Sequence, residues 1–163
     1  LRSATAKKLT NLNGVVNEAL LFLRHELQRH DVRVSLDLDS RGPLIVGDRV
    51  QLQQVVVNLA FNAIQAMTSA GVTERWIILR TQSASDGLVT IAVEDTGPGI
   101  PIDMRGRIFE SFYTTKATGM GIGLAICRSI VEAHGGVIAV QSRREGDGAR
   151  FEISLPFGPG ELA

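Results

Sequence analysis

The residues of this 163-residue chain that could do chemistry fall into three groups, and the first of these is rich in glycine. Gly119, Gly121 and Gly123 lie where the chain enters a helical pattern, and a helix start offers an anion unpaired backbone N–H groups and the positive end of the helix dipole. The P-loop pattern is absent, and residues 114–118 do not form the strand that a dinucleotide fingerprint needs. A phosphate site of another kind and a simple turn are both compatible with these glycines.

The second group is an acidic residue beside two more glycines. Asp95 follows the predicted strand of residues 88–94 and begins the sequence Asp-Thr-Gly-Pro-Gly. This sequence is good turn chemistry, and that structural interpretation stays open. The functional interpretation is a carboxylate that accepts a hydrogen bond from an amino group such as that of adenine, with Gly97 and Gly99 leaving room for the ring.

The third group is a pair of asparagines. Asn58 and Asn62 are four residues apart in the predicted helix of residues 48–67, so their side chains share one face. A neutral amide oxygen suits Mg²⁺, which takes hard oxygen ligands from protein, phosphates and water. The alternative is a pair of amides that bond to backbone. The two belong to an uncharged polar stripe, which indicates hydrogen bonding rather than a solvated face: Gln51, Gln54, Asn58, Asn62 and Gln65.

Together these groups resemble the ATP-binding domain of sensor histidine kinases, within the wider Bergerat-fold family that also includes gyrase-type, chaperone-type and mismatch-repair ATPases. The resemblance covers nearly the whole chain, follows the family's order of motifs, and implies ATP and Mg²⁺ as cofactors. The matching segments are the N box at residues 58–63, the first glycine box at 95–99, the F box at 109–116, the second glycine box at 119–124, and two further stretches at 134–136 and 148–156.

The resemblance implies a role for each residue of the site. Asp95 would accept from the adenine amine, Asn62 would hold Mg²⁺, and Asn58 would support the metal and the phosphates. Lys116 is the catalytic candidate, placed to reach the terminal phosphate, and the alternative for it is a solvated lysine on a mobile loop. The other expected ATP contacts are Ala66, Gly97, Gly99, Ile100, Thr115, Gly119, Gly121, Ile122, Gly123 and Leu124, of which Ala66, Ile100 and Leu124 would wall the base.

The identity of residue 58 separates two chemistries. The hydrolysing relatives place a glutamate base four residues before the metal-binding asparagine, whereas this chain has Asn58, and an amide cannot take a proton. The resemblance therefore implies in-line transfer of the γ-phosphoryl group of ATP to a histidine on a helical dimerisation domain, for relay to an aspartate of a response regulator. A same-fold ATPase and a non-catalytic nucleotide-sensing module are the alternatives. Met120 and Ala149, which stand where the family often has threonine, bear on ATP affinity.

The three histidines of the chain are not expected to accept the phosphoryl group. His25 and the glutamate after it resemble the family's acceptor motif, but the usual proline is missing. His30 and His134 lie at predicted helix ends, where a positive charge favours the helix dipole. The acceptor domain is therefore expected outside the chain. Residues 1–10 would be the remnant of that upstream helical dimerisation domain, residues 11–157 the ATP-binding catalytic domain, and residues 158–163 a C-terminal tail.

The remaining pattern predicts how these groups are held. Runs of helix followed by pairs of strands favour a two-layer α/β sandwich, with a mixed sheet of about five strands packed on three helices and a mobile ATP lid. Phe109 and Phe112 would pin the lid to the body or serve as ordinary core aromatics. Periodicity predicts helices at residues 11–30, 48–67 and 121–134, and strands at residues 32–39, 44–46, 75–82, 88–94, 137–141 and 150–155.

Composition limits the classes of function. Lys plus Arg and Asp plus Glu number 17 each, so no diffuse basic field favours nucleic acid. The single Cys127 excludes an intramolecular disulfide and, among apolar neighbours, indicates a reduced core thiol. No uncharged apolar run reaches the roughly 20 residues that span a bilayer, and the first residues lack a signal-peptide pattern. We expect a cytoplasmic, monomeric domain whose full-length protein is a homodimer, with any membrane anchor elsewhere in that protein.

Overall fold

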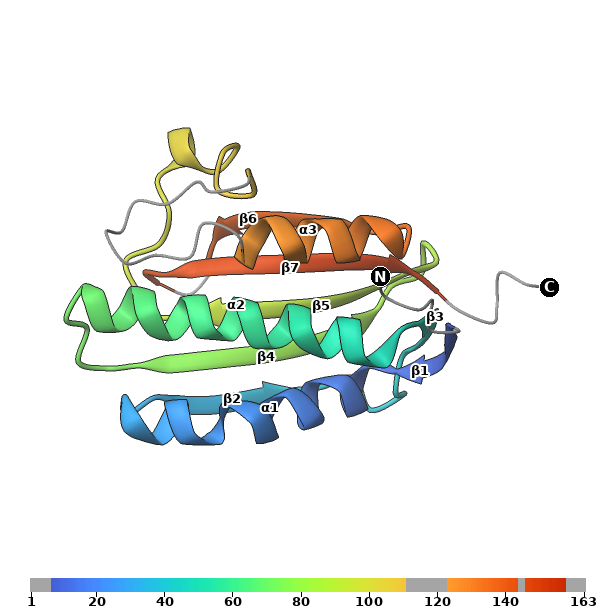
Figure 1. The fold of residues 1–163 in the computed structure, drawn as a ribbon, viewed down its shortest axis with the longest axis horizontal. Helices are drawn as coiled ribbons and strands as arrows, with labels where there is room; N and C mark the ends of the chain where they lie inside the picture. Colours follow the sequence, from blue (N-terminus) through green and yellow to red (C-terminus); the bar gives the residue numbers. More distant parts are fainter. Residues whose placement is uncertain (1–6, 111–122, 144–145, 158–163) are drawn as a thin grey trace, which may run out of the picture.

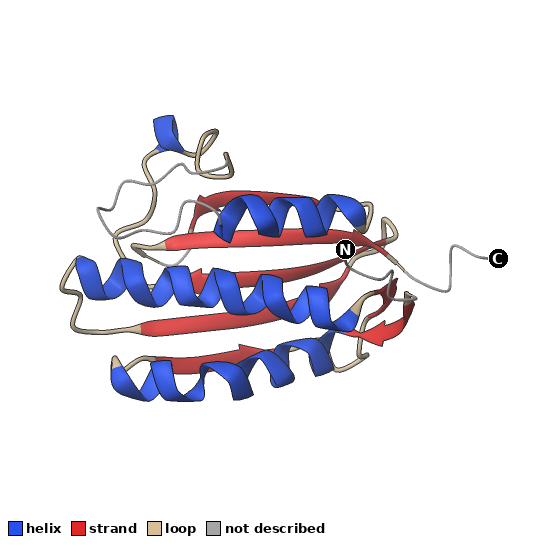
Figure 2. Cartoon of the chain, in the orientation of Figure 1, coloured by secondary structure: helices blue, strands red, loops and turns tan. Residues whose placement is uncertain are grey.

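The computed structural model describes residues 7–110, 123–143 and 146–157. Within these residues, a five-stranded mixed sheet carries three α-helices on one face, which confirms the predicted two-layer α/β sandwich (Figures 1 and 2). The helices are α1 (Leu12–Arg29), α2 (Arg49–Ser69) and α3 (Gly123–Ala133), with a short 3-10 helix η1 (Ile102–Met104). The sheet contains β2 (Arg33–Asp37), β4 (Trp76–Ser83), β5 (Leu88–Asp95), β6 (Val137–Ser142) and β7 (Ala149–Pro156), and a separate two-stranded sheet contains β1 (Lys8–Asn11) and β3 (Leu44–Gly47).

The order of the strands places the end of β5 in the middle of the sheet. The order is β2-β4-β5-β7-β6, with β2 and β4 parallel and the other neighbours antiparallel. Strand β7 alternates buried and half-buried residues along its whole length, because one face packs on the helices and the other faces outward. In the register of β5 and β7, Glu94 lies opposite Arg150, so the last residue of β5, Asp95, lies beside the first residue of β7, Ala149.

Strand β1 is a feature that the sequence analysis did not foresee. Residues 8–10 were expected to belong to the upstream domain and residue 11 to begin the first helix, but residues 8–11 pair antiparallel with β3, with Leu9 opposite Val46. Thr10 is buried, and its Oγ1 donates to the carbonyl oxygen of Gly47 at 3.3 Å. A strand of four residues is too short to show a period of two above the surrounding sequence, so its pairing partner, rather than its own pattern, defines it.

Helix α2 forms the centre of the helical layer, between α1 and α3 (Figure 1). The predicted N-cap is confirmed, because the side chain of Asp48 accepts from the backbone N–H groups of Val50 at 3.1 Å and Gln51 at 3.2 Å. None of the described helices is long and apolar enough to cross a membrane. The core residues that α2 contributes are Leu52, Val55, Val56, Leu59, Ala60, Ala63, Ile64 and Met67.

His134 does not act as the helix-end cation that the sequence suggested. Its ring is buried, and Nε2 accepts the backbone N–H of Asp48 at 3.0 Å. An acceptor nitrogen carries no proton, so the ring is neutral and Nδ1–H donates to the carbonyl oxygen of Ile130 at 2.8 Å. The imidazole thereby connects the C-terminal end of α3 to the N-cap of α2. Sequence position alone could not show this contact, because the partner is 86 residues away.

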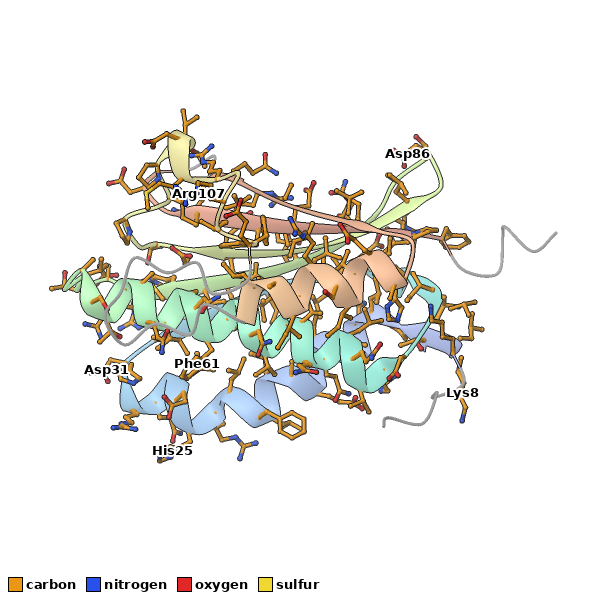
Figure 3. All side chains as sticks on the ribbon, turned by 45° about the horizontal axis from the view of Figure 1, so that its top comes forward. Lys8, His25, Asp31, Phe61, Asp86 and Arg107 are labelled. Atoms are coloured by element: carbon orange, nitrogen blue, oxygen red, sulfur yellow. The ribbon has the colours of Figure 1, made fainter. Side chains whose placement is uncertain are left out.

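Replacing His134 with alanine should therefore destabilise the whole domain. The substitution leaves the buried N–H of Asp48 without a partner and opens a cavity, which together should lower the free energy of unfolding by about 2–4 kcal/mol. Thermal unfolding measures the effect. His25→Ala is the control, because His25 lies on the exposed side of α1 (Figure 3). Equal melting temperatures for the two variants would contradict the assigned role.

Candidate nucleotide site

The centre of the site is the carboxylate of Asp95, the last residue of β5. Its side chain is only 4% exposed. One oxygen, Oδ1, accepts the backbone N–H of Gly97 at 2.8 Å and that of Ala149 at 3.4 Å. Oδ2 accepts from no residue that the structure describes. The protein thus fixes one oxygen of the carboxylate and leaves the other for a donor from outside.

Burial changes the pKa of the Asp95 carboxyl group. Removal from water raises the pKa of Asp95 above its ordinary value, and the N–H groups of Gly97 and Ala149 and the positive charge of Arg143 oppose that rise. The fold thus places a carboxyl group where burial disfavours its charged form. A carboxyl group held in this way is more typical of a recognition or catalytic site than of a core.

Close approach of backbone explains the glycines around Asp95. A Cβ at Gly97 would lie 2.9 Å from Asp95 Oδ1 and 3.2 Å from Met67 Cγ, so the loop needs a residue without a side chain there. Gly99 has a φ of +78° and packs against the backbone of Gly148. A Cβ at Gly148 would lie 1.8 Å from the carbonyl oxygen of Asp95. Gly148 is therefore a site residue, whereas the sequence analysis included it only as the start of the matching stretch 148–156 and gave it no role at the site.

The predicted N box lies on the side of α2 that faces α3. Asn58 hydrogen-bonds the Cys127 thiol of α3, and that thiol also approaches the carbonyl oxygen of Val55 at 3.8 Å. Burial raises the pKa of Cys127 to about 12, so the thiol is neutral, as expected for a core cysteine. Helical spacing places Asn62 and Ala66 one and two turns further along the same side.

The half-buried residues of the site suit the walls of a cleft. Asn58, Asn62, Ala66, Ile100 and Leu124 are all half-buried, and the two larger apolar side chains, Ile100 and Leu124, pack against the core. Gly123 is the first residue of α3. Five further predicted ATP contacts lie outside the described residues: Thr115, Lys116, Gly119, Gly121 and Ile122. Phe112 and Met120 also lie outside them.

The residues present are compatible with Mg²⁺ held mainly by a nucleotide. No three histidine, cysteine, aspartate or glutamate side chains gather into a metal-binding group within the described residues. Asn62 offers a neutral oxygen on a half-buried helix face, which is the type of single protein ligand that Mg²⁺ takes when phosphates and water complete its shell.

Phe109 anchors the segment that follows residues 96–101, the loop that contains Gly97 and Gly99 and that we call the glycine loop. Its ring is buried and contacts Phe151 of β7 edge to face, with 6.1 Å between the centroids and 87° between the planes. Phe109 therefore belongs to the core and ties the start of the F box to the sheet. The core interpretation of the sequence analysis is confirmed for Phe109, whereas its proposed contact with the lid involves residues outside those described.

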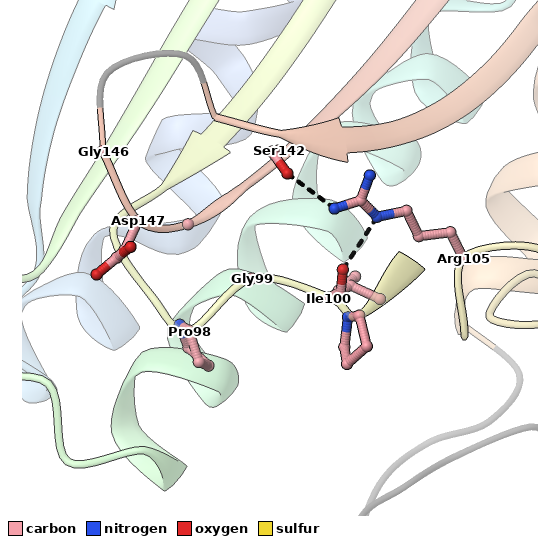
Figure 4. A pocket seen from close by; sticks show the side chains of 9 residues that line it. Pro98, Gly99, Ile100, Arg105, Ser142, Gly146 and Asp147 are labelled. Atoms are coloured by element: carbon pink, nitrogen blue, oxygen red, sulfur yellow. Dashed lines mark hydrogen bonds between the residues drawn. The ribbon is translucent and has the colours of Figure 1, made fainter. Parts of the chain in front are cut away.

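A hollow lies beside the glycine loop, between that loop and the turn that joins β6 to β7 (Figure 4). Its volume is about 430 Å³. Arg105 crosses it, with Nε donating to the Ile100 carbonyl oxygen at 3.0 Å and Nη2 donating to Ser142 Oγ at 2.8 Å. The hollow shares Gly99 and Ile100 with the predicted ATP contacts, but its lining includes neither Asp95 nor a residue of α2. Arg105 thus fastens the outer side of the loop to β6.

Comparison with protein families and curated proteins identifies the family of this chain. The family model described as "Histidine kinase-, DNA gyrase B-, and HSP90-like ATPase" matches residues 47–159. The sensor histidine kinase TmoS of Ectopseudomonas mendocina is 42% identical over 156 residues, which cover 95% of this chain and 16% of that protein. The sensor protein FixL of Bradyrhizobium diazoefficiens is 38% identical over 155 residues, covering 95% of this chain and 30% of that protein. The chain thus spans less than a third of the length of either relative.

Solved structures show the same architecture. The nucleotide-free catalytic domain of histidine kinase ThkA matches with a TM-score of 0.83 and 29% identity, over 96% of this chain and 99% of that one. Full-length ShkA in complex with AMPPNP gives 0.79 and 28%, over 96% of this chain and 32% of that one. ThkA in complex with the response regulator TrrA gives 0.78 and 28%, over 95% and 43%. The chain therefore belongs to the histidine kinase-, DNA gyrase B- and HSP90-like ATPase family, as an ATP-binding catalytic domain of the sensor histidine kinase type.

Proposed function

We propose that this domain transfers the γ-phosphoryl group of ATP to a histidine on a helical dimerisation domain outside the chain. The observation that carries the proposal is the buried carboxylate of Asp95, which has one oxygen fixed by two backbone N–H groups and the other free to accept the adenine amine. The proposal concerns the activity of a longer protein, since the chain spans 16% of TmoS and 30% of FixL.

Different residues would contact the adenine, the metal ion and the phosphates of ATP. Asp95 Oδ2 would accept from the adenine amine, while Ala66, Ile100 and Leu124 would contact the faces of the base. Asn62, supported by Asn58, would hold Mg²⁺, which neutralises negative charge on the phosphates. Gly97 and Gly99 would form the loop beside the base. The remaining proposed contacts are Thr115, Lys116, Gly119, Gly121, Ile122 and Gly123, with Lys116 as the catalytic residue at the terminal phosphate.

Asn58 favours a kinase over an ATPase. It occupies the position of the water-activating glutamate of the hydrolysing relatives, and here it is an amide that hydrogen-bonds a neutral thiol. Neither group can take a proton from water at neutral pH. The transferred phosphoryl group then needs an acceptor that brings its own nucleophile, such as an imidazole nitrogen.

We also infer the partners from the relatives. ThkA forms a complex with the response regulator TrrA, which supports an aspartate of a receiver domain as the next acceptor. Residues 1–10 would be the remnant of the upstream dimerisation domain, the full-length protein would be a homodimer, and residues 11–157 would form a cytoplasmic domain that is monomeric alone. The balanced charge of the chain gives no support for a nucleic-acid partner.

Supplying the domain with γ-labelled ATP, Mg²⁺ and a helical domain that carries an acceptor histidine tests the proposal. The expected product is a phosphohistidine, which is labile in acid and stable in alkali. Steady phosphate release in the absence of the acceptor would identify an ATPase instead. Binding of ATP with neither product would identify a nucleotide-sensing module.

Asp95→Asn should reverse the preference of the site for the purine. The N–H groups of Gly97 and Ala149 require an acceptor at the Oδ1 position, so the amide oxygen goes there and the amide NH₂ faces the adenine amine. ATP affinity should fall by about 10- to 100-fold, while inosine triphosphate, whose 6-oxo group accepts, should lose little. Calorimetric titration measures both affinities. Asp31→Asn is the exposed control, and a variant that still prefers ATP would contradict the orientation proposed for Asp95.

ATP binding should also weaken as the pH falls. The raised pKa of Asp95 means that protonation begins at a higher pH than the ordinary value of 3.8 would give, and a protonated Oδ2 is a poorer acceptor. The sign for stability is opposite, because a buried carboxyl with a raised pKa destabilises the fold when it is ionised. Asp95→Asn should therefore remove the pH dependence of binding without lowering the melting temperature. A steep acid loss of ATP affinity that persists in this variant would assign the effect to another group.

Asn62→Ala should remove the magnesium-dependent part of binding. Alanine suits a helix at least as well as asparagine, so the fold should not suffer. We expect ATP affinity in Mg²⁺ to fall about tenfold and affinity in EDTA to stay unchanged. Gln54→Ala is the matched control, because Gln54 is an exposed amide of the same helix. Equal loss of affinity with and without Mg²⁺ would show that Asn62 contacts the nucleotide and not the metal.

A further inference from the structure

A cluster of charged side chains lies on the face of the sheet opposite the helices. Its centre is Glu94, which is 5% exposed although it belongs to the outward-facing side of β5. We call Glu94, Arg80, Arg143 and Arg150 the outer cluster. Arg80 Nε lies 2.9 Å from Glu94 Oε2, Arg143 Nε lies 3.5 Å from Oε1, and Arg150 Nη1 bonds Oε2. One carboxylate therefore connects three arginines that come from β4, the end of β6 and β7.

The pKa of Glu94 indicates that the neighbouring arginines favour its ionised form. Burial alone would raise its pKa, but the hydrogen bonds and charges of Arg80 and Arg150 outweigh burial, so the pKa of Glu94 lies below its ordinary value. Two further carboxylates complete the surroundings. Asp37 Oδ2 lies 2.5 Å from Arg80 Nη1, and Glu152 Oε2 lies 2.7 Å from Arg150 Nη2. The cluster is an ionised network at neutral pH.

The cluster joins the same strand ends that form the adenine site. Glu94 and Arg150 are opposite each other in the register of β5 and β7. The next residues along the two strands, Asp95 and Ala149, meet through the N–H to Oδ1 contact at 3.4 Å. That distance is near the limit for a hydrogen bond, so a small displacement of β7 would remove one of the two donors that orient the carboxylate. Arg143 N–H also donates to the Gly148 carbonyl oxygen at 3.2 Å and closes the turn before β7.

We propose that the outer cluster positions Asp95 for purine recognition, by holding the ends of β5, β6 and β7 so that the N–H of Ala149 reaches Oδ1. The proposal rests on the proposed function, because it assumes that Asp95 reads the adenine amine. Glu94 and Arg150 do not touch the nucleotide in this scheme. They act through Asp95 and are positioning residues.

Removal of the central charge should separate the strand ends. In Glu94→Gln three guanidinium groups meet at a neutral amide, and their mutual repulsion is no longer balanced at the centre of the cluster. The shape of the side chain is kept, so packing changes little. The carboxylate of Asp95 should then lose its fixed orientation while the rest of the pocket persists.

The experiment compares ATP with inosine triphosphate, which differ at the atom that Asp95 reads. Glu94→Gln should weaken ATP binding about tenfold and leave inosine triphosphate binding unchanged, so that discrimination between the two is lost. Glu18→Gln is the matched control, because it removes another ion pair, with Arg49 at 2.7 Å, far from the site. A structural role alone would weaken both nucleotides equally or neither, and either result would overturn the proposal.

Two additional measurements keep the test decisive. Amide hydrogen exchange of Ala149, followed without nucleotide, should speed up in Glu94→Gln but not in Glu18→Gln. If the wild-type chain bound neither nucleotide, the proposed function would fail, yet this exchange rate would still report on the positioning. If Glu94→Gln did not fold, Arg150→Lys would replace it, since lysine keeps the charge but loses the fork that reaches both Glu94 and Glu152. Unchanged discrimination in Arg150→Lys would overturn the proposal.

Discussion

The structure depends on holding one carboxyl group at the buried end of a central strand. Backbone N–H groups from two different segments reach the same oxygen of Asp95 and, with the positive charge of Arg143, favour the carboxylate form that burial disfavours. Gly97 lies two residues further along the chain, whereas Ala149 lies 54 residues away on β7. The hydrogen-bonding requirement of a single side chain therefore couples the loop after β5 to the register of β5 and β7. A change in the register of β5 and β7 would therefore move the N–H of Ala149 away from Asp95 Oδ1.

The need to surround the Asp95 carboxyl group also explains why glycine occupies two neighbouring positions, where the backbone lies too close to other atoms to carry a side chain. Gly148 lies against the carbonyl oxygen of Asp95, and Gly97 lies between the Asp95 carboxylate and Met67 of α2. These glycines are often interpreted as sources of flexibility. Here they have the opposite effect, since the absence of a Cβ lets three segments pack into contact around the carboxylate. The rigid part of the site is thus built from the sheet, the end of α2 and the turn before β7.

Sequence reasoning succeeded where a residue's role is set by its neighbours along the chain. The three helices, the sheet strands, the Asp48 cap and the place of Asp95 at a strand end follow from periodicity and local hydrogen bonding, and all are confirmed. It failed where the partner is distant. Strand β1 is defined by β3, and the ring of His134 is an acceptor because the backbone N–H of Asp48 donates to it. Glu94 had no role in the sequence analysis beyond ending a strand, and only the register brings Arg80 and Arg150 to it.

The surroundings of Asn58 bear on the choice between the proposed phosphoryl transfer and hydrolysis. Position 58 faces α3, where its amide bonds a thiol whose pKa burial raises to about 12. A glutamate there would lie against a neutral, buried thiol. Desolvation would raise the pKa of such a carboxyl and favour its protonated form, which cannot act as a base. A hydrolysing site needs both the carboxylate and a polar setting for it. In this chain α2 packs on α3 through Cys127 at that position, so under the proposed function the amide at position 58 and the contact with Cys127 would act together to favour transfer over hydrolysis.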